Sequence, residues 1–194
     1  MIIIKVFLLI GTFSLSQSKN RFMPNLPFGE YRVVFEKMYP CEPNGNHPFQ
    51  FNIYFDKKTF NETEVKGNVT VMRPFDDNFT FDLNWSSWGS TGGWIPNSNI
   101  YITKKACSTL KNLNGNLWFL AIKALNIKSP NCPIPVGTYV SSGLDLKILE
   151  NHNFPKIYFY GKYKMIFKVK NEENKIYGCE CLEIQLIRPW ETPI

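Results

Sequence analysis

Strict alternation between apolar and polar residues is the feature that most constrains how this chain folds. Four apolar residues occupy every second position of one segment: Phe49, Phe51, Ile53 and Phe55. Because side chains along a strand point to opposite faces with a period of two, this pattern predicts a strand with one buried face. Three further segments alternate in the same way: 64–71, 78–85 and 162–170.

The C-terminal part of the chain has the pattern of a hairpin. The polar segment 171–174 follows the alternating residues 162–170, and 175–187 is predicted to return as the partner strand. The chain also contains 16 Phe and 9 Tyr among its 194 residues, and flat aromatic rings pack well on pleated sheets. The sequence therefore predicts a mainly β fold built from antiparallel strands.

The middle of the chain lacks this alternation. Segments 103–113 and 117–126 are predicted to be helical, with Gly115 as the break between them. Apolar residues recur at helical spacing in the second segment: Leu117, Leu120, Ala121, Ala124 and Leu125. The predicted fold class is thus a mainly β, antiparallel sandwich with one or two short helices.

Residues 1–16 have the pattern of a secretory signal peptide. Lys5 precedes a short apolar run, and the small residue Ser16 stands at the predicted cleavage point, with Ser18 as the alternative. Cleavage leaves residues 17–194, which are predicted to form one domain. A membrane anchor is disfavoured because the apolar run is shorter than the ~20 residues that a spanning helix needs. The predicted localisation is secreted and extracellular.

Four glycosylation sequons also favour secretion. Their asparagines are Asn61, Asn68, Asn78 and Asn84. Three of them, at 68, 78 and 84, fall on the polar phase of a predicted strand, where an attached glycan points to water. Two independent patterns therefore agree on which face of these strands lies outside.

Five cysteines allow two disulfides and leave one thiol over: Cys41, Cys107, Cys132, Cys179 and Cys181. An oxidising compartment favours disulfide formation. Cys179 and Cys181 are two residues apart on a predicted strand, so they share a face. Either of them could reach Cys41, and the other would then be free.

Residues that support catalysis are scarce. The two histidines, His47 and His152, lie in turn-like sequence, and Glu172 and Glu173 belong to a polar turn and not to an acid–base pair. No segment has the spacing of a nucleophile elbow, a metal site or a phosphate-binding loop. The formal net charge of +6 is spread along the chain, which suits transient contact with a membrane surface better than nucleic-acid binding. The sequence predicts no enzyme activity, cofactor, metal or nucleic-acid partner.

The C-terminal half resembles the ganglioside activator-like proteins. Cys132-Pro133 and Gly137-Thr138-Tyr139 are similar to that family's Cys-Pro-x-x-x-Gly-x-Tyr motif. Three further matches lie in the expected order around it: Lys105-Ala106-Cys107, Phe154-Pro155 with Gly161-Lys162-Tyr163, and Gly178-Cys179. The insect chemosensory B proteins are the more similar branch, and the resemblance spans about residues 94–187.

This resemblance implies a β-cup, the lipid-recognition type of fold, with an apolar cavity for an acyl chain or a similar ligand. It also implies the disulfides Cys41–Cys179 and Cys107–Cys132. The candidate ligand-binding residues stand on inward strand phases or in the adjoining Trp-rich segment: Phe51, Phe55, Phe79, Phe81, Trp85, Trp88, Trp94, Met165 and Phe167. Each of them could instead belong to an ordinary filled core.

Three tryptophans stand among Gly and Ser in segment 85–96. Because Gly permits movement and Trp suits both an apolar interior and a wet boundary, a mobile aromatic lip at the mouth of the cup is one interpretation. The alternative is that these tryptophans cap strand ends inside the core.

The leading functional hypothesis is a secreted carrier or presenter of a lipid or apolar small ligand. The insect relatives suggest chemosensory or pheromone perception as its setting. A second hypothesis is a protein-interaction module that modulates a receptor or a channel, which predicts a filled core. A third is an activator that extracts lipid from membranes for a hydrolase.

Overall fold

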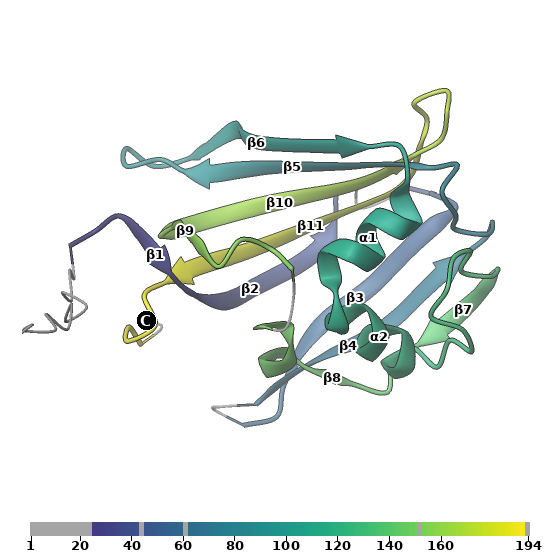
Figure 1. Ribbon diagram of the computed structural model, residues 1–194, viewed down its shortest axis with the longest axis horizontal. Coiled ribbons are helices and arrows are strands. Elements are labelled where there is room, and N and C mark those ends of the chain that lie inside the picture. The colour runs from purple at the N-terminus through teal and green to yellow at the C-terminus, as the bar shows by residue number, and fades with distance from the viewer. Residues whose placement is uncertain (1–24, 43–44, 60–61, 151–152, 193–194) are drawn as a thin grey trace, which may run out of the picture.

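A computed structural model describes residues 25–42, 45–59, 62–150 and 153–192 of this chain. The predicted signal peptide, the sequon asparagine Asn61 and His152 lie outside the described residues. Antiparallel sheets dominate the described residues, with two short helices (Figure 1). The predicted mainly β, antiparallel fold class is confirmed.

The larger sheet has five antiparallel strands. Its order across the sheet is β2 (Arg32–Pro40), β11 (Ile176–Ile187), β10 (Gly161–Lys170), β5 (Thr80–Trp88) and β6 (Trp94–Thr103). The hairpin predicted at the C-terminus is its centre, where Met165 pairs with Leu182 and Val169 with Gly178. Alternation along β10 buries Tyr163, Met165 and Val169 on one side and leaves the lysines on the other.

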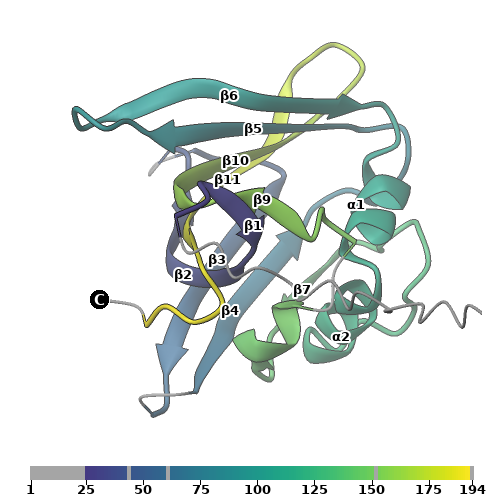
Figure 2. The ribbon, with the colours of Figure 1, turned by 60° about the vertical axis from the view of Figure 1, so that its left-hand side comes forward.

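The second sheet faces the first and combines two long strands with two short ones. It contains β3 (Phe49–Lys57), β4 (Thr63–Val71), β7 (Gly137–Val140) and β8 (Leu144–Asp145), with β4 paired to each of the other three. A separate two-stranded ribbon joins β1 (Phe28–Glu30) to β9 (Ile157–Phe159), and a 3-10 turn, η1 (Leu146–Glu150), follows β8. Figure 2 shows the two main sheets as two layers with the helices on one flank.

Two consecutive helices lie on that flank, α1 (Ala106–Asn114) and α2 (Asn116–Ala124). Gly115 separates them, as predicted, because its φ of 55° lies in the left-handed region that glycine favours. A Cβ at this position would also lie 2.9 Å from Asn153 Nδ2. In the described part of the chain, no helix is long and apolar enough to cross a membrane.

Two details of the predicted strand 78–85 are corrected. The strand begins at Thr80, because Asn78 lies in a turn where its backbone N–H and its side-chain Nδ2 donate to the Asp76 carboxylate. Asp82 was expected to face water but is only 9% exposed. Asp82 forms an ion pair with Lys170 of the neighbouring strand. The long Lys170 side chain covers the carboxylate, and alternation along the strand does not reveal this cover.

One end of the interior is filled by aromatic rings. Phe49 lies 5.2 Å from Phe79 and 5.6 Å from Phe75, and Phe79 lies 5.2 Å from Tyr177, measured between ring centroids. The backbone N–H of Ala106 donates to Phe79 O at 3.0 Å, which places this cluster beside the start of α1. The sheets are therefore closed at this end by ordinary core packing.

Candidate functional site

The space between the two main sheets contains two adjoining pockets, each of about 370 Å³. Five residues line both of them: Phe35, Leu110, Asn114, Leu117 and Leu182. They come from the larger sheet and from the two helices, so the pockets meet where the helices face β2 and β11. We call the two together the central cavity.

The first pocket, named here the Trp85 pocket, lies under the five-stranded sheet. Four of the predicted ligand-binding residues line it: Phe81, Trp85, Met165 and Phe167. They share this side because Trp85 is paired with Met165, and Phe81 with Val169, across the β5–β10 ladder. Tyr158 of β9 completes the pocket, with its ring centroid 5.5 Å from that of Trp85.

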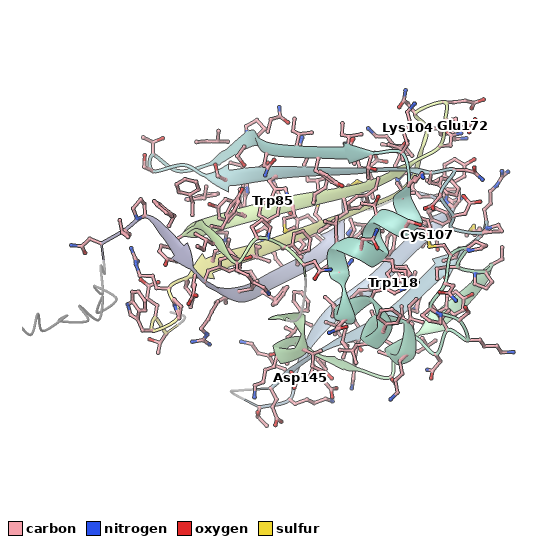
Figure 3. The ribbon with its side chains drawn as sticks, in the orientation of Figure 1. Trp85, Lys104, Cys107, Trp118, Asp145 and Glu172 are labelled. Atoms are coloured by element: carbon pink, nitrogen blue, oxygen red, sulfur yellow. A yellow bond between two sulfur atoms is a disulfide. The ribbon has the colours of Figure 1, made fainter. Side chains whose placement is uncertain are left out.

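The second pocket, named here the Phe51 pocket, lies against the smaller sheet. Two more of the predicted ligand-binding residues, Phe51 and Phe55 of β3, line it together with Val65 and Val69 of β4. Trp118 of α2 forms its opposite wall and donates through Nε1 to Pro130 O at 2.8 Å. Figure 3 shows Trp85 and Trp118 well separated along the interior, one from β5 and the other from α2.

Polar groups lie mainly in the Trp85 pocket. Tyr31 donates through its hydroxyl to Pro155 O at 2.6 Å, and burial raises the pKa of Tyr31, which keeps this donor protonated. Asn99 Nδ2 lies 3.5 Å from Tyr158 Oη, and Asn114 Nδ2 donates to Leu110 O at 2.7 Å. Among the described residues that line either pocket, none carries a charge at neutral pH.

Sequence reasoning missed the contribution of the helices to the cavity. Leu110, Leu113 and Leu117 all line it, yet none was among the candidate residues. Two spacings within single helices are the signal that would have found them: Leu110 and Leu113 are three residues apart on α1, and Leu117 is four residues before the cavity-lining Ala121 on α2. Residues at these spacings share one face of a helix. The candidate residues came only from strands and the adjoining Trp-rich segment, whereas the helices form a third wall of the cavity.

Three of the predicted ligand-binding residues do not line the cavity. Phe79 belongs to the filled aromatic end described above. Trp88 and Trp94 lie 5.1 Å apart at the end of the β5–β6 hairpin. Lys164 Nζ lies 4.7 Å from the Trp94 ring, and because Lys164 neighbours the inward-facing Met165, this contact is on the outer side of the sheet. This placement does not favour a lip around the central cavity.

A matched pair of tryptophan variants tests this placement. Trp85→Ala is expected to weaken the uptake of a fluorescent fatty acid about tenfold or more, because an aromatic wall of the cavity is lost. Trp88→Ala, three residues away on the same strand, should change uptake less than about twofold. Titrations of both folded variants provide the measurement. Equal losses in the two variants would restore the lip interpretation.

Two disulfides hold the structure together, and both are the pairs that the family resemblance implied. Cys41–Cys179 joins the end of β2 to β11, and Cys107–Cys132 joins α1 to the segment before β7. The sequence left open whether Cys179 or Cys181 pairs with Cys41, and the structure shows that Cys179 does. Cys181 is a free, buried cysteine.

The described sequon asparagines lie on the outer side of the molecule. Asn78 is exposed in its turn. Asn68 of β4 is a neighbour of the cavity-lining Val69 and points the other way, where Asn52 Nδ2 donates to its Oδ1 at 3.2 Å. Asn84 of β5 donates through Nδ2 to Asn97 Oδ1 at 2.6 Å. Glycosylation at these positions stays a prediction.

Groups that could hold a metal ion do not occur in the part of the chain that the structure describes, where no three His, Cys, Asp or Glu side chains gather suitably. His47, the described histidine, lies 3.8 Å from Glu42, outside the central cavity.

Fold and site together define a class: a two-layer antiparallel β protein with an uncharged, largely apolar cavity between its layers. No protein-family model matches the chain, and no curated protein matches it. Among solved structures, chicken MD-1 in a complex with lipid IVa is similar. The two chains are 12% identical with a TM-score of 0.33, and the match covers 81% of this chain and 91% of MD-1. Similarity at this level does not place the chain in a family.

Proposed function

We propose that this chain binds the apolar part of a lipid or a similar amphipathic ligand in the central cavity. In this proposal it acts as a secreted carrier or presenter and not as an enzyme. The observation that carries the proposal is the cavity itself, with its uncharged lining between two sheets. A volume of about 370 Å³ for each pocket lies within the range of small-molecule sites.

The energetics of such a site come mainly from the hydrophobic effect. Each methylene of a ligand tail that leaves water contributes about 0.8 kcal/mol, so a long tail binds well with few polar contacts. Water in a space lined by Phe51, Val69 and Leu182 finds few hydrogen-bond partners, which favours its replacement by hydrocarbon.

The distribution of polar groups suggests an orientation for the ligand. The Phe51 pocket has mainly aliphatic and aromatic walls and suits the end of a tail. The Trp85 pocket carries Asn99 and the hydroxyls of Tyr31 and Tyr158, which can form hydrogen bonds with a neutral head group. A buried charge would find no partner there, so the ligand is expected to place any ionised group outside.

Ligand uptake and extraction test the proposal together. The purified chain is titrated with a fluorescent fatty acid, and a second sample is extracted with organic solvent for mass spectrometry. We expect saturable fluorescence enhancement, or a co-purified lipid that blocks it until the protein is delipidated. A protein that remains folded, yields no lipid and gives no enhancement would contradict the proposal.

The setting of this activity is also part of the proposal. The resemblance to insect chemosensory B proteins suggests an extracellular carrier for an apolar signal. Expression of the chain in a secreting insect cell line should yield a processed, glycosylated protein in the medium. Intact-mass measurement before and after removal of N-glycans checks both features, and an unglycosylated chain that stays in the cell would contradict them.

A further inference from the structure

Three sulfur atoms meet at the edge where β2 pairs with β11. Cys41 and Cys179 form a disulfide, and the free Cys181 has its Sγ 3.5 Å from Cys41 Sγ. Cys179 and Cys181 are each 5% exposed. The remaining thiol is therefore held against the disulfide and is shielded from other reactants.

The strand register explains this arrangement. Cys181 pairs with Tyr39 and Glu180 with Pro40, so the next residues along, Cys41 and Cys179, stand opposite one another. The backbone N–H of Cys41 donates to Cys179 O at 3.4 Å, which continues the ladder. Because alternate residues share a face of a strand, Cys181 sits diagonally across from Cys41 on the same side as Cys179.

We propose that Cys181 exchanges with this disulfide, so that Cys41 has two alternative covalent partners. In the exchange, Cys181 loses its proton and the thiolate sulfur attacks Cys41 Sγ. A Cys41–Cys181 bond forms, the Cys41–Cys179 bond breaks, and its electron pair leaves on Cys179 Sγ, which takes up a proton. One disulfide and one thiol are present before and after, so the step needs no oxidant or reductant.

The surroundings of Cys181 control how fast this exchange runs. Burial is the largest influence and raises the pKa of the thiol. The nearby titratable groups divide by strand: Glu180 and Glu183 of β11 raise the pKa further when they are ionised, while Lys164 and Lys168 of β10 lower it. Tyr39 of β2 also faces the thiol. The attacking thiolate is scarce at neutral pH, so the exchange is slow there and accelerates as pH rises.

The exchange connects the covalent state of the chain to the central cavity. It moves the attachment of Cys41 by two residues along β11, a distance of roughly 7 Å at the usual rise of a strand. Cys41 begins the connection between β2 and β3, and Phe51 and Phe55 of β3 line the Phe51 pocket. The two isomers therefore anchor one wall of that pocket differently.

Thiol mapping tests the exchange in the intact chain. Samples are held at pH 6 and at pH 9, denatured in acid with N-ethylmaleimide, digested without reduction and analysed by mass spectrometry. We expect the label on Cys181 alone at pH 6, and a label on Cys179 in at least about a tenth of the molecules after pH 9, given the thiolate's role in exchange. Label that stays on Cys181 alone at pH 9 would overturn the proposal.

Two variants test whether Cys181 can form a disulfide with Cys41. Cys179→Ser removes the observed partner, and we expect its remaining cysteines to form Cys41–Cys181 within one chain. Cys181→Ser should keep Cys41–Cys179 and take up no label at either pH. A folded Cys179→Ser chain with two free thiols, or one that forms only intermolecular disulfides, would show that Cys181 does not reach Cys41 and would overturn the proposal.

Discussion

Leu117→Trp is expected to reduce the uptake of a fluorescent fatty acid at least about tenfold while the protein remains folded. Leu117 lines both pockets and begins the face of α2 that looks into the central cavity. An indole at this position occupies the junction through which a tail passes from one pocket to the other. Excluding two or more methylenes from burial costs about 1.6 kcal/mol or more, which corresponds to this loss of affinity.

Phe119→Trp provides the matched control for this variant. It introduces the same side chain two residues along the same helix, at a residue that is 47% exposed and lines neither pocket. Uptake by this variant should be unchanged within about twofold. If both variants bound the fatty acid as tightly as the original chain, the ligand would not pass the junction and the proposed route would be wrong.

Glu180→Gln is expected to raise the melting temperature by roughly 5–10 °C at pH 8 and above, and by little at pH 4. Glu180 pairs with Phe167 in the β10–β11 register and so faces the interior. It is 3% exposed, and neither carboxyl oxygen has a hydrogen-bond partner among the described residues. Burial raises its pKa to about 8, because the ionised form is poorly solvated there.

The pH dependence follows from this raised pKa. Below about pH 4.5 the carboxyl is protonated in both the folded and unfolded chains, so its contribution does not change with pH. Between pH 4.5 and about 8 the unfolded chain loses the proton while the folded chain retains it, so stability falls as pH rises. The neutral amide of Gln removes this loss. Thermal unfolding of both proteins across this range measures the widening difference.

Glu183 supplies a control on the same strand with the opposite sign. It is also buried, but Tyr39 donates to its Oε1 at 2.7 Å and Lys37 Nζ lies 3.5 Å from its Oε2. Glu183→Gln therefore weakens existing contacts and is expected to lower the melting temperature at neutral pH. Parallel melting curves for Glu180→Gln and the original chain across the pH range would show that Glu180 is not held neutral by burial.

Prediction from the sequence succeeded wherever one local pattern decides the structure. The alternation around Phe51 and Met165 located strands and their inward faces, and Gly115 marked the break between the helices. Prediction from the sequence failed for the cavity walls, which depend on several distant elements at once. The spacing of Leu117 and Ala121 predicts one face of a helix, but only the packing of the helices against both sheets makes that face a cavity wall.

Residues on a correctly predicted strand could still be assigned to the wrong surroundings. Phe79 has the same strand phase as Phe81. Its ring nevertheless packs against Phe49 and Tyr177 at the end of the interior that aromatic rings fill, and it does not line the cavity. Trp88 stands three residues after the inward-facing Trp85, so a period of two places it on the outer face, where Lys162 Nζ lies 5.9 Å from its ring. The cluster of tryptophans, and not the strand phase, made it a candidate. Glu180 was not anticipated, because nothing in its neighbours signals an unpaired carboxyl inside the protein.

The most direct measurement is an X-ray structure of the chain with a bromine-tipped fatty acid, located by the anomalous scattering of bromine. We predict a bromine peak between the two main sheets, within contact distance of Phe51 or Val69, with the tail passing Leu117 and Leu182. A structure in which the side chains of the two sheets fill this space, and in which bromine lies only on the outer surface, would contradict ligand binding in the central cavity.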